Sequence, residues 1–142
     1  MDLILDQIPA GASILIDTNP IIYFLKNSNS ASRYQPLFEA VQQGRNELVV
    51  TPITLAEVLG GPARTGNEVL LERYEQALTG GAGWRFVALD AGIAVHAARL
   101  RARYRLKLPD AIQLATALAA GCFAVVTHDR DFSAVTEIPI IA

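Results

Sequence analysis

Cysteine and histidine, the side chains that most often bind zinc, are scarce in this 142-residue chain, which contains one Cys and two His. The single Cys122 has no second cysteine for an intramolecular disulfide, so the sequence gives no support for a disulfide-stabilised protein of an oxidising compartment. His96 and His128 show no spacing typical of a zinc site. Any metal in this protein is therefore expected to be bound by oxygen atoms.

An excess of positive charge and a long apolar segment are also missing. The formal net charge of −2 and the pI near 5.6 argue against a protein that holds nucleic acid through overall basicity, although they allow a local basic patch. The most membrane-like segment, residues 111–126, is interrupted by Gln113, Thr116 and Gly121 and is shorter than the roughly 20 apolar residues of a membrane-spanning helix. The first six residues carry acids where a secretory signal would carry Lys or Arg. We therefore expect a cytoplasmic protein with no membrane partner.

Hydrophobic residues, in contrast, are abundant. They make up 51% of the chain, and the mean hydropathy is +0.29. That content is sufficient for a packed core, and the length is that of one ordinary domain. No internal repeat, low-complexity segment or linker divides the sequence. We therefore expect a single domain over residues 1–142.

Short apolar runs alternate with segments of helical periodicity. Residues 14–16 form an apolar run that ends in Asp17, as in a strand buried on both faces. Gly60 and Gly61 are expected to end the third helix. The predicted strands are residues 13–16, 47–51, 84–89, 123–127 and 138–141, and the predicted helices are residues 21–26, 30–43, 53–59, 65–78, 91–106 and 110–120. This alternation predicts an α/β domain with a mainly parallel sheet covered by helices on both faces.

Four acids fall where predicted elements begin or end. Asp17 is expected to be the last residue of a central strand, and Asp129 follows another strand. Pro109 places Asp110 in the first turn of a helix, and Glu57 lies early in the helix after the second strand. Because the carboxyl ends of parallel strands meet at one edge of a sheet, all four acids are expected to line one rim.

Carboxylates that are held together repel, which raises the pKa of at least one of them unless a cation is bound. Oxygen-only ligation favours hard cations such as Mg²⁺ or Mn²⁺, and Mg²⁺ is usually shared between carboxylates and the phosphates of a substrate. The acids therefore suggest a metal site that acts on a phosphate-containing substrate. Most of them also have an ordinary structural explanation: Asp110 as a helix-start residue, Asp129 or Asp131 as a turn residue, and Glu57 on a solvated helix face. Asp17, which closes an apolar strand, is the hardest to explain in this way.

Four stretches of the chain, in this order and spacing, resemble the PIN-domain nucleases, in particular the VapC-type ribonuclease toxins of bacterial toxin–antitoxin pairs. They are residues 14–19 (ILIDTN), 54–58 (TLAEV), 108–117 (LPDAIQLATA) and 126–132 (VTHDRDF). Each motif alone is weak, whereas the ordered set is specific and covers nearly the whole chain. The resemblance implies a three-layer α/β/α sandwich whose acidic pocket binds Mg²⁺ or Mn²⁺ and cleaves RNA.

By the same resemblance, the catalytic and metal-binding residues are Asp17, Glu57, Asp110 and Asp129. Asn19 and Thr127 match polar positions that support the first and the last of these acids, and Asp131 competes with Asp129 for the role of the fourth acid. The resemblance also implies cleavage that leaves 5′-phosphate and 3′-hydroxyl ends. It further implies a homodimer and a small antitoxin partner whose C-terminal segment blocks the acidic pocket.

Positive charge is concentrated on the predicted helix 91–106, which leads into Asp110. Arg99, Arg103 and Lys107 lie on one side of its apolar stripe, and a further cation, Arg130, lies between two acids. We interpret these four cations as candidates for gripping RNA phosphates beside the metal, with a solvated helix flank as the structural alternative.

Other functions remain open at the level of sequence. A non-toxin PIN nuclease in RNA processing would use the same pocket. A magnesium-dependent phosphatase or phospho-acceptor domain also places an Asp at a strand end, but it needs a Lys near the site, and neither Lys26 nor Lys107 closes a strand. A metal-free ribonuclease needs a pair of acid–base groups, and His96 and His128 are not expected to face each other. A non-catalytic binding module would be favoured only if the acids had been replaced.

Overall fold

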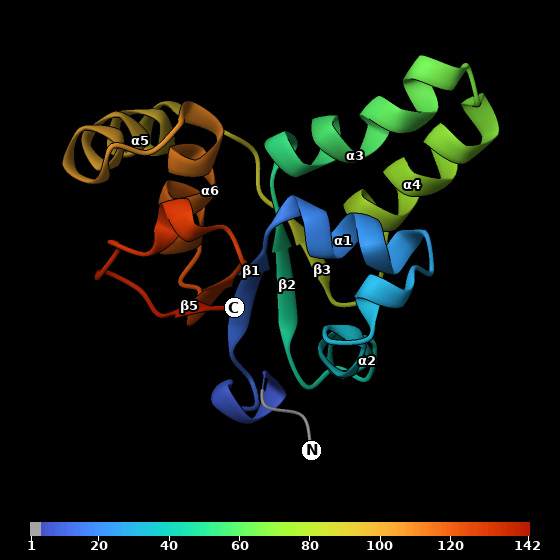
Figure 1. The fold of residues 1–142 in the computed structure, drawn as a ribbon, viewed down its shortest axis with the longest axis horizontal. Coiled ribbons are helices and arrows are strands. Elements are labelled where there is room, and N and C mark those ends of the chain that lie inside the picture. Colours follow the sequence, from blue (N-terminus) through green and yellow to red (C-terminus); the bar gives the residue numbers. More distant parts are fainter. Residues whose placement is uncertain (1–3) are drawn as a thin grey trace.

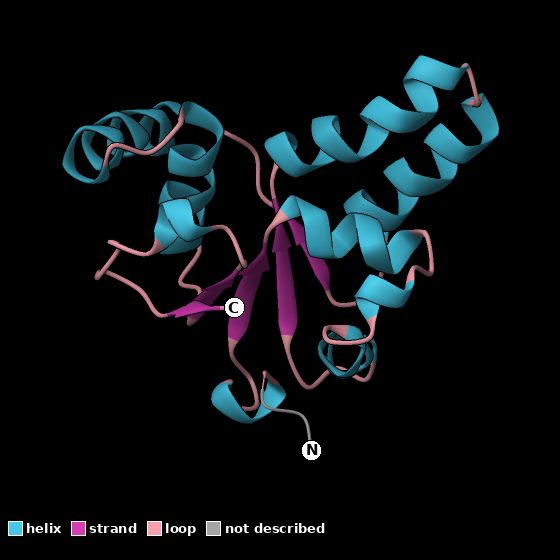
Figure 2. Ribbon diagram, in the orientation of Figure 1, coloured by secondary structure: helices cyan, strands magenta, loops and turns pink. Residues whose placement is uncertain are grey.

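A computed structural model describes residues 4–142 of the chain and has a five-stranded sheet at its centre (Figures 1 and 2). In chain order the strands are β1 Ser13–Ile16, β2 Glu47–Val50, β3 Trp84–Phe86, β4 Ala124–Val126 and β5 Ile140–Ile141. They are arranged in the order β3-β2-β1-β4-β5, and all neighbouring pairs are parallel. The sheet is therefore entirely parallel, where the sequence predicted a mainly parallel one.

Helices cover both faces of the sheet (Figure 1). One layer contains α1 Thr18–Leu25, α2 Gln35–Gln42, α3 Pro52–Thr65 and α4 Glu68–Gly80, and the other contains α5 Ala91–Tyr104 and α6 Leu108–Ala119. Within the described part of the chain there are also three short 3-10 helices, η1 Leu5–Gln7, η2 Asn29–Ala31 and η3 Arg130–Phe132. The three-layer α/β/α sandwich is thus confirmed. Among residues 4–142, no helix is both long and apolar enough to cross a membrane.

The central strands are apolar on both faces, which explains their continuous apolar sequences. In β1, Ile14 and Ile16 belong to the core beneath α1 to α4, whereas Leu15 belongs to the core beneath α5 and α6. Val49 of β2 and Val125 of β4 lie on the same side as Leu15. Because successive side chains of a strand point to opposite faces, a strand between two helix layers needs apolar residues at every position. The sheet therefore provides a buried base for the loops at its carboxyl edge.

The prediction that Gly60 and Gly61 end the third helix is wrong. Helix α3 continues through both glycines to Thr65, and Gly66 ends it with a φ of +69°. A glycine inside a helix costs only about 1 kcal/mol relative to alanine. Burial of the α3 residue Val58 in a core shared with α4 outweighs that cost, so tertiary packing and not local sequence sets the length of α3.

The remaining differences from the predicted elements concern their ends. The predicted helix 30–43 is the 3-10 turn η2 followed by the shorter α2. The predicted helix 65–78 begins only after Asn67, whose side chain accepts a hydrogen bond from the N–H of Leu70 and caps α4. The predicted strand 84–89 stops at Phe86 because its partner strand β2 ends at the paired residue, Val50.

Gly83, directly before β3, adopts a φ of +81°, and a Cβ at this position would lie 2.6 Å from the carbonyl oxygen of Val41. Gly121 has a similar φ of +73°, but no atom lies within 4 Å of its Cβ position. We expect Gly83→Ala to lower the free energy of unfolding by about 2 kcal/mol more than Gly121→Ala does, since both changes strain the backbone and only the first creates a clash. Urea unfolding of the two variants measures this difference, and equal losses would contradict it.

Candidate functional site

Asp17 lies at the junction of β1 and α1, at the carboxyl edge of the sheet. Its N–H donates to the carbonyl oxygen of Val126 at 2.9 Å, which extends the pairing of β1 with β4. Its Oδ1 accepts a hydrogen bond from the N–H of Thr18 at 2.9 Å, so Asp17 is the N-cap of α1 and not, as predicted, the last residue of the strand. Capping holds this carboxylate at the sheet edge. Asn19 is exposed in the first turn of the same helix, and its supporting role stays a prediction.

Thr127, the residue after β4, connects a second segment to Asp17. The residue is 2% exposed, and its hydroxyl donates to Asp17 Oδ2 at 2.8 Å. The same hydroxyl oxygen accepts from the N–H of Asp129 at 3.0 Å. The N–H of Asp131 in turn donates to Asp129 Oδ1 at 2.9 Å. These bonds fix the position of the loop 127–131 relative to Asp17.

Three acids come together at this loop. Asp110, Asp129 and Asp131 each offer one carboxylate oxygen, and these oxygens lie within 4.8 Å of one another. Asp110 is partly buried in the first turn of α6, and the other two side chains are exposed. The sequence left open which of Asp129 and Asp131 accompanies Asp110, and the structure places both beside it. Within the described residues 4–142, Asp17 and Glu57 lie outside this group of three.

The surroundings of Asp110 raise the pKa of its carboxyl group from 3.8 to about 6. Partial burial, which disfavours the charged form, is the largest cause, and the negative charges of Asp17, Asp129 and Asp131 add to it. Lys107 acts in the opposite direction. A set of carboxylates whose negative charge is only partly offset by Lys107, and which offers only oxygen atoms, has the donor chemistry suited to a hard divalent cation. The residues present therefore fit Mg²⁺ or Mn²⁺.

Glu57 is exposed on α3, and its Oε1 accepts a hydrogen bond from the Thr18 hydroxyl at 2.7 Å. Behind Thr18, the hydroxyl of Thr54 lies 3.4 Å away and accepts from Gln113 Nε2 at 2.7 Å. Thr18, Thr54 and Gln113 were not predicted to belong to the site. The one sequence signal for them is that Gln113 interrupts the buried helical run 111–117, where an amide needs hydrogen-bond partners.

The four cations predicted to bind RNA occupy different environments. Lys107 is close to the three acids, with 3.8 Å between its Nζ and Asp131 Oδ2. Arg103 forms an exposed ion pair with Glu137. The other two cations are exposed, namely Arg99 and Arg130. Contact of these side chains with RNA stays a prediction.

The two histidines lie in different parts of the fold. Nδ1 of His128 lies 3.0 Å from the hydroxyl oxygen of Tyr34, and its ring is parallel to that of Tyr23 with centroids 6.4 Å apart. Both tyrosines belong to the side of the sheet covered by α1 to α4. His96 lies on α5, in the opposite layer. The two histidines therefore cannot act as an acid–base pair, and the acids remain as the groups able to carry the chemistry.

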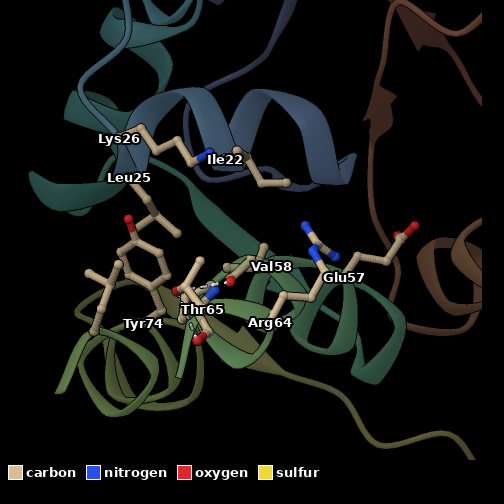
Figure 3. A pocket seen from close by; sticks show the side chains of 11 residues that line it. Ile22, Leu25, Lys26, Glu57, Val58, Arg64, Thr65 and Tyr74 are labelled. Carbon is tan, nitrogen blue, oxygen red and sulfur yellow. Dashed lines mark hydrogen bonds between the residues drawn. The ribbon is translucent and has the colours of Figure 1, made fainter. Parts of the chain in front are cut away.

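A pocket of about 410 Å³ opens next to Glu57, between α1, α3 and α4 (Figure 3). Lys26 and Arg64 bring positive charge to it, and the Arg64 side chain extends beside that of Glu57 in Figure 3. A groove that is apolar inside and charged at its margin suits an amphipathic peptide. Its apolar lining comes from Ile22, Leu25, Val58, Leu70 and Tyr74.

Comparison with known families identifies the class to which this fold and site belong. Residues 14–138 match the model of the PIN domain. Because the match covers most of the chain, this protein belongs to the PIN domain family, whose members are nucleases. A comparison with curated proteins found no match.

Three solved structures illustrate the similarity. A toxin–antitoxin complex from Klebsiella pneumoniae is 27% identical, with a TM-score of 0.68 over 91% of this chain and 96% of that chain. FitAcB from Neisseria gonorrhoeae is 25% identical, with a TM-score of 0.71 over 91% of this chain and 96% of that chain. VapC20 from Mycobacterium tuberculosis, described as a sarcin–ricin loop cleaving toxin, shares the fold at 16% identity, with a TM-score of 0.62 over 85% and 93% of the two chains.

Asp110 makes the stability of the metal-free protein depend on pH. Its pKa is about 6 in the folded protein against an ordinary value of 3.8, so between these values the folded state binds more protons than the unfolded state. The free energy of unfolding therefore falls as the pH rises from about 4 to above 6. Asp110→Asn removes this loss. We expect the variant to be more stable than the wild type by about 1 kcal/mol at about pH 7.5, allowing for solvent screening of a partly exposed side chain, and nearly equal to it near pH 4.

Urea unfolding with a chelator present, at both pH values, measures this difference. Glu72→Gln removes an exposed acid on α4 and is the control, which should follow the wild type throughout. A stabilisation by Asp110→Asn of the same size at both pH values would show that ionisation of the Asp110 carboxyl group is not its cause.

Proposed function

We propose that this protein is a metal-dependent endoribonuclease and the toxin of a type II toxin–antitoxin pair. The observation that carries the proposal is the group of Asp110, Asp129 and Asp131 at the carboxyl edge of a PIN-domain sheet. Asp17 and Glu57 extend this acidic edge from the neighbouring elements α1 and α3. An edge so rich in carboxylates is suited to binding metal and to orienting a nucleophile.

In this proposal the metal ligands and catalytic residues are Asp17, Glu57, Asp110 and Asp129, with Asp131 as a further candidate. Their oxygen atoms suit Mg²⁺ or Mn²⁺. A bound divalent cation would neutralise the acids, lower the pKa of a water molecule for attack on the phosphodiester and offset the charge of the transition state. One of the carboxylates acts as the general base that orients this water. The expected products carry 5′-phosphate and 3′-hydroxyl ends.

Two threonines hold acids in fixed directions before a substrate binds. Thr127 donates to Asp17, and Thr18 donates to Glu57. Both donors are buried, so the carboxylates keep their directions without support from solvent. Orientation that precedes binding reduces the reorganisation needed to reach the transition state. Asn19 is proposed to add a further polar contact at this end of α1.

RNA phosphates are proposed to bind beside the acids through local cations, because the net charge of the chain is negative. Lys107 is already next to Asp131, and Arg130 lies in the loop that carries two of the acids. Such contacts position the backbone without reading the base sequence. Two further candidates on α5 are Arg99 and Arg103.

Support for a toxin comes from the complex of Klebsiella pneumoniae, a toxin–antitoxin assembly that is 27% identical over 91% of this chain. An antitoxin segment in the pocket between α1, α3 and α4 would bury apolar side chains against Val58 and Tyr74. It would also reach Glu57, so binding there would block the acidic edge directly. By the family resemblance we further propose a homodimer that acts in the cytoplasm.

Two alternative functions would use the same acidic residues. A PIN nuclease of RNA processing would share the site and lack an antitoxin. A phospho-acceptor domain would need a lysine near the acids, and within residues 4–142 the contact of Lys107 with Asp131 is the one that suits it. The PIN match over residues 14–138 speaks against that second alternative.

We expect the purified protein to cleave RNA with Mg²⁺ or Mn²⁺ and to stop when a chelator is added. Asp17→Asn should lower the cleavage rate by at least about 100-fold, since it removes the charge of a proposed metal ligand. Gel analysis of a labelled RNA, with end-group mapping of the products, measures both effects. Glu72→Gln, which also removes one negative charge but lies exposed on α4, should cleave like the wild type. Cleavage that resists the chelator, or full activity of Asp17→Asn, would rule out the metal mechanism.

A toxin should have a small antitoxin encoded by the adjacent gene. We expect co-expression of that gene to restore growth of a host inhibited by this protein and to yield a stable complex. Leu70→Gln changes the pocket lining and should weaken the complex roughly tenfold by loss of an apolar contact, with RNA cleavage retained.

The matched control is Val69→Gln. Val69 neighbours Leu70 on α4 but is 70% exposed and does not line the pocket, so this variant should bind the antitoxin like the wild type. Host growth that is unaffected by the protein, with no complex formed, would favour an RNA-processing nuclease. Wild-type binding of the antitoxin by Leu70→Gln would place the antitoxin elsewhere.

A further inference from the structure

Four buried polar side chains form a hydrogen-bonded chain that ends at Glu57. Thr51, Thr54 and Gln113 are at most 1% exposed, and Thr18 is 6% exposed. A polar group removed from water costs free energy unless it is hydrogen-bonded, and apolar side chains would fill the same space without that requirement. The presence of this chain in the interior therefore points to a role other than packing.

Side-chain hydrogen bonds connect Gln113 to Glu57 through two threonines. The Thr18 hydroxyl donates to Glu57 Oε1 at 2.7 Å, and it is also the donor in its longer, 3.4 Å contact with the Thr54 hydroxyl. Thr54 accepts from Gln113 Nε2 at 2.7 Å. Gln113 Oε1 accepts from the hydroxyl of Thr51, which fixes the orientation of the amide.

The same chain connects the helices that carry the acids. Gln113 lies one turn after Asp110 on α6, and Thr54 lies one turn before Glu57 on α3. Thr18, the first residue of α1, closes the gap between them. Hydrogen bonds thus relate the direction of the Glu57 carboxylate to the position of α6.

We propose that Thr18, Thr54 and Gln113 are positioning residues that hold the exposed Glu57 carboxylate in the direction required for metal binding and catalysis. The proposal rests on the nuclease function proposed above. The structural alternative is that these residues only hold α3 against α6 and that the bond to Glu57 has no consequence. The proposal and this alternative predict different effects when only the hydrogen bond from Thr18 to Glu57 is removed.

Thr18→Val removes the donor to Glu57 and keeps the shape of the side chain. We expect this variant to need roughly tenfold more Mn²⁺ for half-maximal RNA cleavage, as when a residue that orients a metal ligand is lost. Thr18→Ser restores the hydroxyl and should bring the requirement back to within about twofold of the wild type. Gln113→Leu removes the far end of the chain and should shift the requirement in the same direction as Thr18→Val.

Thr116→Val is the matched control. Thr116 is also buried, but its hydroxyl donates to the carbonyl oxygen of Ile112 in its own helix at 2.7 Å, so its loss leaves the chain intact. This variant should keep the wild-type Mn²⁺ requirement. In a Glu57→Ala background, Thr18→Val should add little further loss of RNA cleavage, because both changes act through the Glu57 carboxylate. Additive losses, or equal Mn²⁺ requirements in Thr18→Val and Thr116→Val, would overturn the proposal.

A second measurement does not depend on activity. Three-bond NMR couplings of the Glu57 side chain should report a single χ1 rotamer in the wild type and averaging among rotamers in Thr18→Val. A single rotamer in both proteins would overturn the positioning role even if neither cleaves RNA. Averaging in Thr18→Val, together with a wild type that cleaves no RNA, would support the positioning of Glu57 and reject the nuclease function.

Discussion

Repulsion among carboxylates at the carboxyl edge of the sheet is the constraint on which the surrounding structure depends. Asp17, Glu57 and Asp129 each accept a hydrogen bond from a backbone N–H or a threonine hydroxyl, which offsets part of the cost of holding these acids together. Asp110 has the least compensation, since burial and its acidic neighbours raise its pKa to about 6. The deficit of positive charge at this point is the physical basis for expecting a divalent cation there.

The acids can be held this close because the sheet beneath them is rigidly packed. Strands β1, β2 and β4 are buried between two helix layers, and their alternating side chains contribute to both cores. Close-packed interiors of this kind resist small displacements. Asp17 and Thr127 directly follow two of these strands, so the apolar core determines where the first polar groups of the site begin.

Glu57 belongs to two surfaces at once. Its carboxylate is held by Thr18 at the acidic edge, and its side chain also lines the pocket between α1, α3 and α4. In the proposed function, an antitoxin segment in that pocket would inhibit by direct contact, with no conformational change relayed from a distance. The pocket exists because α3 continues past Gly60 and Gly61, which places Arg64 beside Glu57 (Figure 3).

The order of strands and helices and the four candidate acids follow from the sequence alone, because apolar runs, helical periodicity and turn residues act over a few neighbouring positions. Where local signals competed with packing they failed, as at Gly60 and Gly61, which lie inside a helix held by its contact with α4. Only the tertiary structure decided that Asp131 joins the acids and that Gln113 is linked to Glu57 through hydroxyl groups. Contacts between residues so far apart in the chain are set by how helices pack on the sheet, and no local pattern encodes those distances.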